Sequence, residues 1–299
     1  MRSTNTFANR CLLGLLVLIP AFSVACAHNP PPAEAATTWK SPFFFIAMTD
    51  PQLGFFSENA DTAKEAELLQ KAIAQANRLK PAFVVMTGDL IHKPGDDAQR
   101  REFLRITATL DRSIPLHLLA GNHDLGNVPT PQSIDYYRQH FGPDHYSFDM
   151  RGCHFVALNT TLVHSPGKAI QQEAEQWTWL TTDLEQSATK HPIQTILFQH
   201  HPTFLKNPDE PNDYHTVPAP RRAELLQLCR QYNIAAVFAG HLHRCNAASY
   251  RKMQVFAAGP VGKPLGKDPS GLTIVKVYPD RVDYEYHGLD AVPASVTFD

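Results

Sequence analysis

Short apolar runs and longer amphipathic segments alternate through most of the chain. The runs FFFIAMTD (43–50) and AFVVMTGD (82–89) are apolar at nearly every position, which is typical of strands that are covered on both faces. Between them, the segment 59–80 spaces Leu69 and Ile73 as one face of a helix does. This alternation predicts a sheet with helices packed against it.

The rest of the chain continues the pattern before antiparallel β-structure closes it. The predicted helices are 59–80, 96–110, 171–187 and 221–232, and the predicted strands are 43–50, 82–89, 115–124, 193–202 and 234–243. A hairpin with its turn at Arg151-Gly152 is expected over 145–160, and more β-structure at 254–260 and 271–288. We therefore predict an α/β domain in which mixed β-sheets are flanked by helices on their outer faces.

One stretch, KNPDEPNDYHTVPAP (206–220), has no periodicity and is rich in proline. Long loops of this kind are often functional. Because it follows the predicted strand 193–202, we expect it to form a lid over whatever that strand end binds.

The start of the chain is typical of an export signal. A polar segment with two arginines precedes the apolar run CLLGLLVLIPAF, which is short for a membrane span. We expect a signal peptide at 1–26, a Pro/Ala-rich linker at 27–40 and one domain at 41–299. The sequence allows two ways of processing this signal: lipidation of Cys26, or cleavage after Ala27. Both predict an exported protein, in the bacterial periplasm or anchored to the outer membrane as a lipoprotein through Cys26.

Composition adds few constraints. The chain has 299 residues, a formal net charge of −2 and 19% charged residues, so nothing in it indicates nucleic-acid binding. The interior cysteines, Cys153, Cys229 and Cys245, are too few for a disulfide framework. We expect a monomer that binds no nucleic acid.

Polar side chains gather at the ends of the predicted strands. They are Asp50, Asp89, the triplet Asn122-His123-Asp124, His200, His241 and His243. In α/β sheets ligands bind beyond the carboxyl ends of the strands, so these side chains should converge. Carboxylates and imidazoles without thiolates favour Zn²⁺, Mn²⁺ or Fe over a structural cysteine–zinc site. A carboxylate shared by two cations would hold them about 3.5–4 Å apart, as phosphoryl-transfer sites require.

Five blocks in order, TDPQLG, GDLIH, GNHD, QHHP and GHLH, make the sequence resemble the calcineurin-like metallophosphoesterases. Longer stretches, YYRQHFGPDHYSFDMRGCHFVALNT and GKDPSGLTIVKVY among them, are similar to the calcineurin-like phosphoesterase domain-containing protein 1 subgroup of that family. The resemblance covers roughly residues 41–290. It implies a metallophosphoesterase-type sandwich of mixed β-sheets flanked by α-helices, with the active site at the carboxyl ends of the strands.

The resemblance also implies a role for each motif residue. The first metal would be held by Asp50, Gln52 and His243, Asp89 would bridge both metals, and the second would be held by Asn122, His200 and His241. His123 would protonate the leaving oxygen or stabilise charge on the phosphoryl group, and Asp124 would orient the His123 ring. The cofactors would be two divalent metal ions, with Mn, Fe, Zn and Mg all open.

Gln52 departs from the family pattern, which usually has Asp-x-His in this block. An amide binds a metal through its oxygen or leaves a water in its place, which favours Mn²⁺ or Mg²⁺ at the first site. The subgroup shares this glutamine, so the resemblance implies a variant of the site. Two further residues, His92 and Lys263, stay open between a surface role and a site role.

These observations predict an exported, metal-dependent phosphoesterase that hydrolyses phosphate monoesters with a metal-activated water at a dinuclear centre. The alternatives are a phosphodiesterase acting on cyclic nucleotides or lipid headgroups, and a non-catalytic metal- or phosphate-binding protein of the cell envelope. The motifs do not separate the two reactions, because the same metal centre serves both.

Overall fold

The computed structural model describes Trp39 and residues 41–298. One group of strands is β1 (Phe43–Met48), β2 (Val84–Met86), β3 (Leu116–Leu118), β10 (Gly271–Val277) and β11 (Val282–Gly288). A second group is β4 (Tyr146–Met150), β5 (Cys153–Leu158), β6 (Thr195–Gln199), β7 (Ile234–Ala239), β8 (Asn246–Tyr250) and β9 (Met253–Ala257). The helices are α1 (Ala63–Leu79), α2 (Asp97–Thr107), α3 (Asn122–Leu125), α4 (Pro131–His140), α5 (Thr160–His164), α6 (Ile170–Ala188) and α7 (Ala219–Gln231).

Each group of strands forms a mixed sheet. The first sheet has the order β11-β10-β1-β2-β3 and the second the order β4-β5-β6-β7-β9-β8. Strands β1, β2 and β3 are parallel, as are β5, β6, β7 and β9. The other described strands are antiparallel to their neighbours and lie at the margins of these parallel sets. Strand β10 pairs with β1 and β11, β4 pairs with β5, and β8 pairs with β9.

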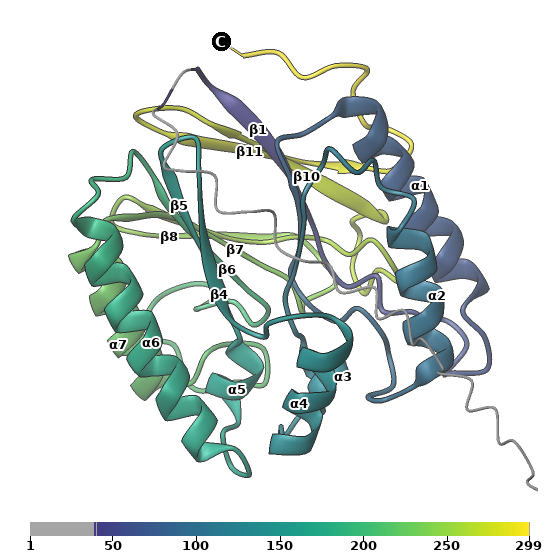
Figure 1. Ribbon diagram of the computed structural model, residues 1–299, viewed down its shortest axis with the longest axis horizontal. Helices are drawn as coiled ribbons and strands as arrows, with labels where there is room; N and C mark the ends of the chain where they lie inside the picture. The colour runs from purple at the N-terminus through teal and green to yellow at the C-terminus, as the bar shows by residue number, and fades with distance from the viewer. Residues whose placement is uncertain (1–38, 40, 299) are drawn as a thin grey trace, which may run out of the picture.

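Successive side chains of the central strands enter different cores. In β1, Ile46 packs in the core that contains residues of α1 and α2, whereas Phe45 packs between the two sheets. The Phe45 ring meets Phe198 of β6 edge to face, with centroids 5.6 Å apart. In β6, Leu197 faces the opposite way, into a core shared with α6 and α7. The result is two sheets face to face, with α1 and α2 outside one and α6 and α7 outside the other (Figure 1).

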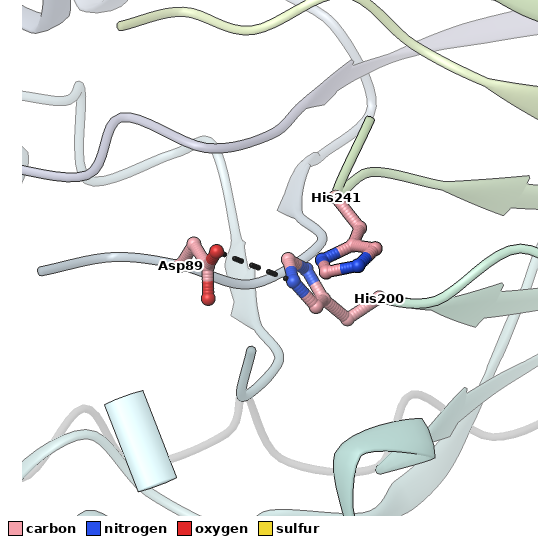
Figure 2. Close-up of side chains that lie close together, drawn as sticks. All are labelled: Asp89, His200 and His241. Atoms are coloured by element: carbon pink, nitrogen blue, oxygen red, sulfur yellow. Dashed lines mark ion pairs between the residues drawn. The ribbon is translucent and has the colours of Figure 1, made fainter. Parts of the chain in front are cut away.

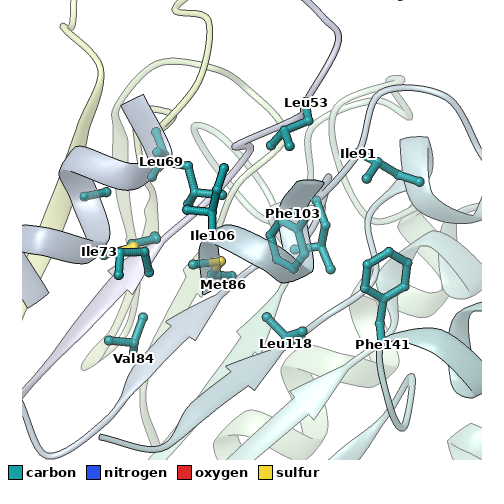
Figure 3. Packing of buried hydrophobic residues seen from close by; sticks show 14 of the residues in the cluster. Leu53, Leu69, Ile73, Val84, Met86, Ile91, Phe103, Ile106, Leu118 and Phe141 are labelled. Carbon is teal, nitrogen blue, oxygen red and sulfur yellow. The ribbon is translucent and has the colours of Figure 1, made fainter. Parts of the chain in front are cut away.

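Figure 3 shows the core beneath α1 and α2. Leu69 and Ile73 of α1 and Phe103 and Ile106 of α2 are fully buried over the first sheet. Burying an aliphatic or aromatic side chain of this size stabilises the fold by about 1.5–3 kcal/mol. The core thus fixes the sheet whose strand ends carry the site.

The predicted α/β sandwich of mixed sheets flanked by helices is confirmed. Each predicted helix is present with ends shifted by a few residues, and the hairpin turns at Arg151-Gly152, where both residues have positive φ. The predicted strand 115–124 was too long. Pairing ends at Leu118, and the chain then forms the short helix α3, where the Asp124 carboxylate accepts the Gly121 N–H.

Sequence reasoning missed α4, α5 and β8. Helix α4 begins with Thr130-Pro131 and a reciprocal hydrogen bond between Thr130 and Ser133, a capping pattern that is readable from sequence.

The signal peptide and Cys26 lie outside the described residues, so export and the domain boundary at residue 41 stay predictions. None of the helices in the described part of the chain combines the length and the apolar character that a membrane span requires.

Candidate metal centre

The predicted ligands converge at the carboxyl ends of the parallel strands. Asp50 follows β1, Asp89 follows β2, and Asn122 opens α3 just after β3. From the second sheet, His200 follows β6 directly, and His241 follows β7 by two residues. The site therefore lies where the two sheets bring their strand ends together, as the sequence predicts.

In the part of the chain that the structure describes, two groups of ligand atoms lie close enough to hold a metal ion. One is Asp89, His200 and His241, and the other is Asp50, Asp89 and His243; within each, one ligand atom from every residue lies within 4.8 Å of the others. We call Asp50, Asp89 and His243 the first cluster, and Asp89, His200 and His241 the second cluster. Figure 2 shows the second cluster, with an oxygen of Asp89 3.3 Å from Nε2 of His200. Asp89 belongs to both clusters, which is the position of a bridging ligand.

Backbone carbonyls orient the histidines of both clusters. Nδ1 of His200 lies 2.8 Å from the carbonyl oxygen of Thr87, and Nδ1 of His243 lies 2.6 Å from that of Lys263. A carbonyl only accepts, so these Nδ1 atoms carry protons and Nε2 is the ring nitrogen that faces the carboxylates of the clusters. In His241 the arrangement is reversed, because Nε2 faces the carbonyl of Tyr214 at 3.3 Å and Nδ1 is free. Metal-binding histidines commonly donate their other ring N–H in this way.

One polar atom of the Gln52 side-chain amide has a hydrogen-bond partner, and the other has none. Its Nε2 lies 3.1 Å from Nδ1 of His92, whereas its Oε1 is buried without a hydrogen-bond partner. A buried acceptor left unpaired costs about 1–3 kcal/mol. The free atom is an oxygen, so it fits a divalent cation.

His123 is held by a stack of aromatic rings. Its ring stacks on His92, with centroids 4.7 Å apart, and His92 stacks on Phe55 at 4.8 Å. Nδ1 of His123 donates to the carbonyl oxygen of His92 at 2.8 Å. The sequence left a surface role and a site role open for His92. In the structure His92 contacts both His123 and Gln52 and therefore supports the site.

The position of Asp124 differs from the sequence-based expectation. We expected its carboxylate to orient the ring of His123, but a carbonyl occupies that position. Asp124 instead accepts hydrogen bonds from the backbone N–H groups of Leu90, Ile91 and Gly121. Burial and the charge of Asp89 raise the pKa of Asp124 to about 7. Its contacts join the loop after β2 to the loop after β3, so Asp124 positions the site through the backbone.

The backbone is left-handed at several candidate ligands. The φ angles of Asp50, Gln52, Asp89, His241 and His243 are all positive, between 42° and 73°. At Gly121 and Gly240 the chain comes so close to its neighbours that a side chain would collide with Asp89 or with Thr49 and Asp50, respectively. Close approach of these loops brings carboxylates and imidazoles together.

Burial and charge act against each other on the pKa values of the site. Burial raises the pKa of Asp50 above its ordinary value, although His243 and His200 partly offset this effect. Burial would also raise the pKa of Asp89, but His200 and His123 outweigh it and hold that pKa below its usual range. Burial would lower the pKa of His200, but the Asp89 carboxylate raises it to about 9. Asp89 is therefore an anion at neutral pH, as a shared metal ligand must be.

The donor set fits divalent metal ions. Buried carboxylates next to imidazoles need a compensating positive charge, and the unpaired amide oxygen of Gln52 offers a further ligand. Asn122 lies beside the second cluster, with its Oδ1 3.0 Å from Nε2 of His200. Oxygen and imidazole donors suit Mn²⁺, Fe and Zn²⁺.

Two site residues were not singled out from the sequence. Tyr214, in the loop expected to be a lid, bonds to Asn122 through its hydroxyl at 3.2 Å. Asn127 accepts from the same Asn122 amide nitrogen at 2.9 Å. Only the length and composition of the loop pointed toward Tyr214.

His201 is buried beside His241, with ring centroids 4.3 Å apart, and does not belong to either cluster.

This fold with two clusters that share a carboxylate defines a metallophosphoesterase. The chain belongs to the calcineurin-like phosphoesterase family, whose model matches residues 45–245. It is 34% identical to the serine/threonine-protein phosphatase CPPED1 of Pongo abelii over 87% of this chain and 88% of that protein. The resemblance to the calcineurin-like phosphoesterase domain-containing protein 1 subgroup is thereby confirmed. The protein is a metal-dependent hydrolase acting on phosphoric ester bonds.

Two further comparisons bear on the family. The cAMP/cGMP dual specificity phosphodiesterase MT0825 of Mycobacterium tuberculosis (strain CDC 1551 / Oshkosh) is 28% identical over 72% of this chain and 69% of its own length. A crystal structure of a dimetal phosphatase from Danio rerio superposes with a TM-score of 0.59 at 18% identity, covering 84% of this chain and 97% of that one. This likeness supports the fold.

Proposed function

We propose that the protein is a phosphomonoesterase with two divalent metal ions, one in each cluster. The observation that carries this proposal is that Asp89 belongs to both clusters. Asp50, Gln52 and His243 would complete the first site, and Asn122, His200 and His241 the second. Relatives named serine/threonine-protein phosphatase support monoester hydrolysis.

The bound ions would supply positive charge for the phosphoryl oxygens and lower the pKa of a coordinated water. The protein's own catalytic contribution would come from His123. With Nδ1 donating to the carbonyl of His92, Nε2 is the ring nitrogen left to exchange a proton. In its protonated form His123 donates from Nε2 to the leaving oxygen, or hydrogen-bonds a phosphoryl oxygen. The stacked His92 ring limits rotation of this imidazole, so the proton is delivered from a fixed direction.

Phosphodiester hydrolysis is the second candidate, and the similarity to a cyclic-nucleotide phosphodiesterase favours it. The two reactions differ in the groups attached to phosphorus and use the same clusters. Residues around the rim, such as the half-exposed Tyr214, would therefore decide between the substrates.

A paired assay tests the function. The purified protein is stripped with a chelator and reconstituted with Mn²⁺, and hydrolysis of an aryl phosphate monoester is compared with that of the corresponding diester. Monoester turnover that depends on Mn²⁺ is expected. A preference for the diester would replace the proposal with the second candidate, and tight Mn²⁺ binding with neither activity would favour the binding-protein alternative. Phosphoserine and phosphothreonine peptides then test whether the relatives' named substrates apply here.

We also propose that the protein is exported. The apolar run in the first residues and the Pro/Ala-rich linker up to residue 40 support this proposal. Expression in a bacterium followed by fractionation tests it, with Cys26→Ala compared to the parent protein. Membrane association that Cys26→Ala abolishes is expected for the lipoprotein. Release of both proteins into the periplasm would indicate ordinary cleavage after Ala27, and retention of both in the cytoplasm would contradict export.

A further inference from the structure

Tyr214 contacts two candidate ligands of the second site with two different atoms. Its hydroxyl accepts a hydrogen bond from Nδ2 of Asn122 at 3.2 Å. Its backbone carbonyl accepts from Nε2 of His241 at 3.3 Å. The ring lies beside the His241 imidazole, with centroids 4.9 Å apart. One loop residue thus contacts an amide and an imidazole of the same proposed metal site.

The contacts of Asn122 show what the hydroxyl does. Nδ2 of Asn122 also donates to Oδ1 of Asn127 at 2.9 Å, and the Tyr214 hydroxyl lies 3.4 Å from that oxygen. Both partners hold the nitrogen end of the amide, so the oxygen end faces Nε2 of His200 at 3.0 Å. A rotation of 180° would exchange the two ends and turn a donor toward the cluster. A metal ion binds only the oxygen of an amide.

The loop that carries Tyr214 is built into the fold. The Glu210 carboxylate accepts hydrogen bonds from the backbone N–H groups of Leu205 and Lys206. The buried guanidinium of Arg222, on α7, donates to the carbonyl oxygen of Glu210. The N–H of Val217 donates to the carbonyl of Pro202 at 3.0 Å. These bonds fix both ends of the segment 205–217 and therefore the place of Tyr214.

We propose that Tyr214 and Asn127 are positioning residues for the second metal site. They determine which end of the Asn122 amide faces the cluster, and Tyr214 also fixes the ring of His241. The affinity for one of the two ions therefore depends on a side chain of the 205–217 loop. This inference rests on the ligand role proposed for Asn122, and it does not require that the substrate be a monoester.

Metal titration tests the inference without measuring turnover. Mn²⁺ binding to the purified protein is followed by calorimetry for the parent, Tyr214→Phe, Asn127→Ala and the double variant. Tyr214→Phe removes the hydroxyl and leaves the ring and the backbone carbonyl. Changes in residues that orient metal ligands typically cost about 10–100-fold in affinity. We expect that loss for one ion in the double variant, a smaller loss in each single variant, and unchanged affinity for the other ion.

Tyr232→Phe is the matched control. The hydroxyl of Tyr232 also bonds to an amide nitrogen, Nε2 of Gln231 at 3.0 Å, but it lies before β7, at the opposite end of that strand from His241. Its Mn²⁺ affinities should equal those of the parent.

Parent-like affinity for both ions in a folded double variant would overturn the inference, and so would an equal loss for both ions. If the double variant does not fold, Tyr214→Phe alone decides, since it removes one hydroxyl from a half-exposed side chain. A parent protein that binds two ions but hydrolyses no ester would refute the proposed function and leave this result intact.

Discussion

The carbonyl oxygen of His92 lies 2.8 Å from Nδ1 of His123, in the place where we expected the carboxylate of Asp124. The same type of partner orients His200, His241 and His243. The orientations of all four rings are therefore set by the path of the backbone. Any change that moves these loops should disturb metal binding and proton transfer together.

His123→Asn should reduce turnover and leave metal binding intact. General acid–base groups contribute about 10²–10⁴-fold to rate, and His123 belongs to neither cluster. We expect kcat on an aryl phosphate to fall by that factor with an unchanged Mn²⁺ content. His191→Asn, at an exposed position just before β6 and remote from the site, is the control. A kcat equal to that of the parent would show that His123 is not catalytic.

Asp89→Asn should weaken binding of both metal ions, because Asp89 is the residue common to the two clusters. The amide keeps the shape of the side chain and removes the negative charge that both ions would share. Metal analysis after dialysis should find less than one ion per chain, with hydrolysis near background. Asp280→Asn makes the same change on an exposed turn and should bind as the parent does. Loss of one ion only would mean that Asp89 does not bridge.

Gly121→Ala should destabilise the protein and disrupt the centre. The added methyl group would collide with Oδ1 and the backbone nitrogen of Asp89. Overpacking of this kind costs about 1–3 kcal/mol, which urea unfolding measures. At Gly167 the nearest atom to an added methyl is Cγ1 of Val128, 3.8 Å away, so Gly167→Ala should retain stability and metal. Parent-like metal affinity in Gly121→Ala would show that the loops have room to move apart.

The pH dependence of stability should include a contribution from His154, remote from the metal centre. Its ring nitrogens lie 2.6 Å from Asp149 and 2.9 Å from Asp183. Burial would lower the pKa of His154, but the two carboxylates outweigh it and raise the pKa above 6.5. The folded state therefore holds this proton more tightly than the unfolded state. The resulting stability is fully present below the unfolded pKa and is lost as pH rises through the folded pKa.

Urea unfolding of the parent and of His154→Asn at about pH 5.5 and about pH 8.5 measures this effect. The free energy of unfolding of the parent should exceed that of His154→Asn by more at the lower pH than at the higher pH. His117 provides the opposite case, because burial lowers its pKa to about 3. Relative to His117→Phe, the parent should lose stability as pH falls through 6.5, where the unfolded histidine takes up its proton. An advantage of His154 that is independent of pH would contradict its raised pKa.

The sequence predicted the order of strands and helices and the polar residues that follow the strands, such as Asp50, because these are local signals. The strands themselves end a few residues earlier than predicted. The shared position of Asp89 was implied only by the family resemblance, because the residues alone do not show how two sheets pack. Sequence reasoning also misassigned the partner of His123, because a backbone carbonyl leaves no mark on the sequence. Tyr214 was missed for a related reason. Nothing adjacent to it in the chain indicates that its hydroxyl meets Asn122, 92 residues earlier.

The left-handed backbone at Asp50, Gln52, Asp89, His241 and His243 sets stability against function at the same five positions. Residues other than glycine in such conformations cost about 1–3 kcal/mol each, whereas glycine adopts them freely. Glycine would relax the chain there and would also delete a candidate ligand. Selection of this protein for heat resistance alone should therefore accumulate inactive variants changed at these five positions, unless hydrolysis is selected in the same experiment.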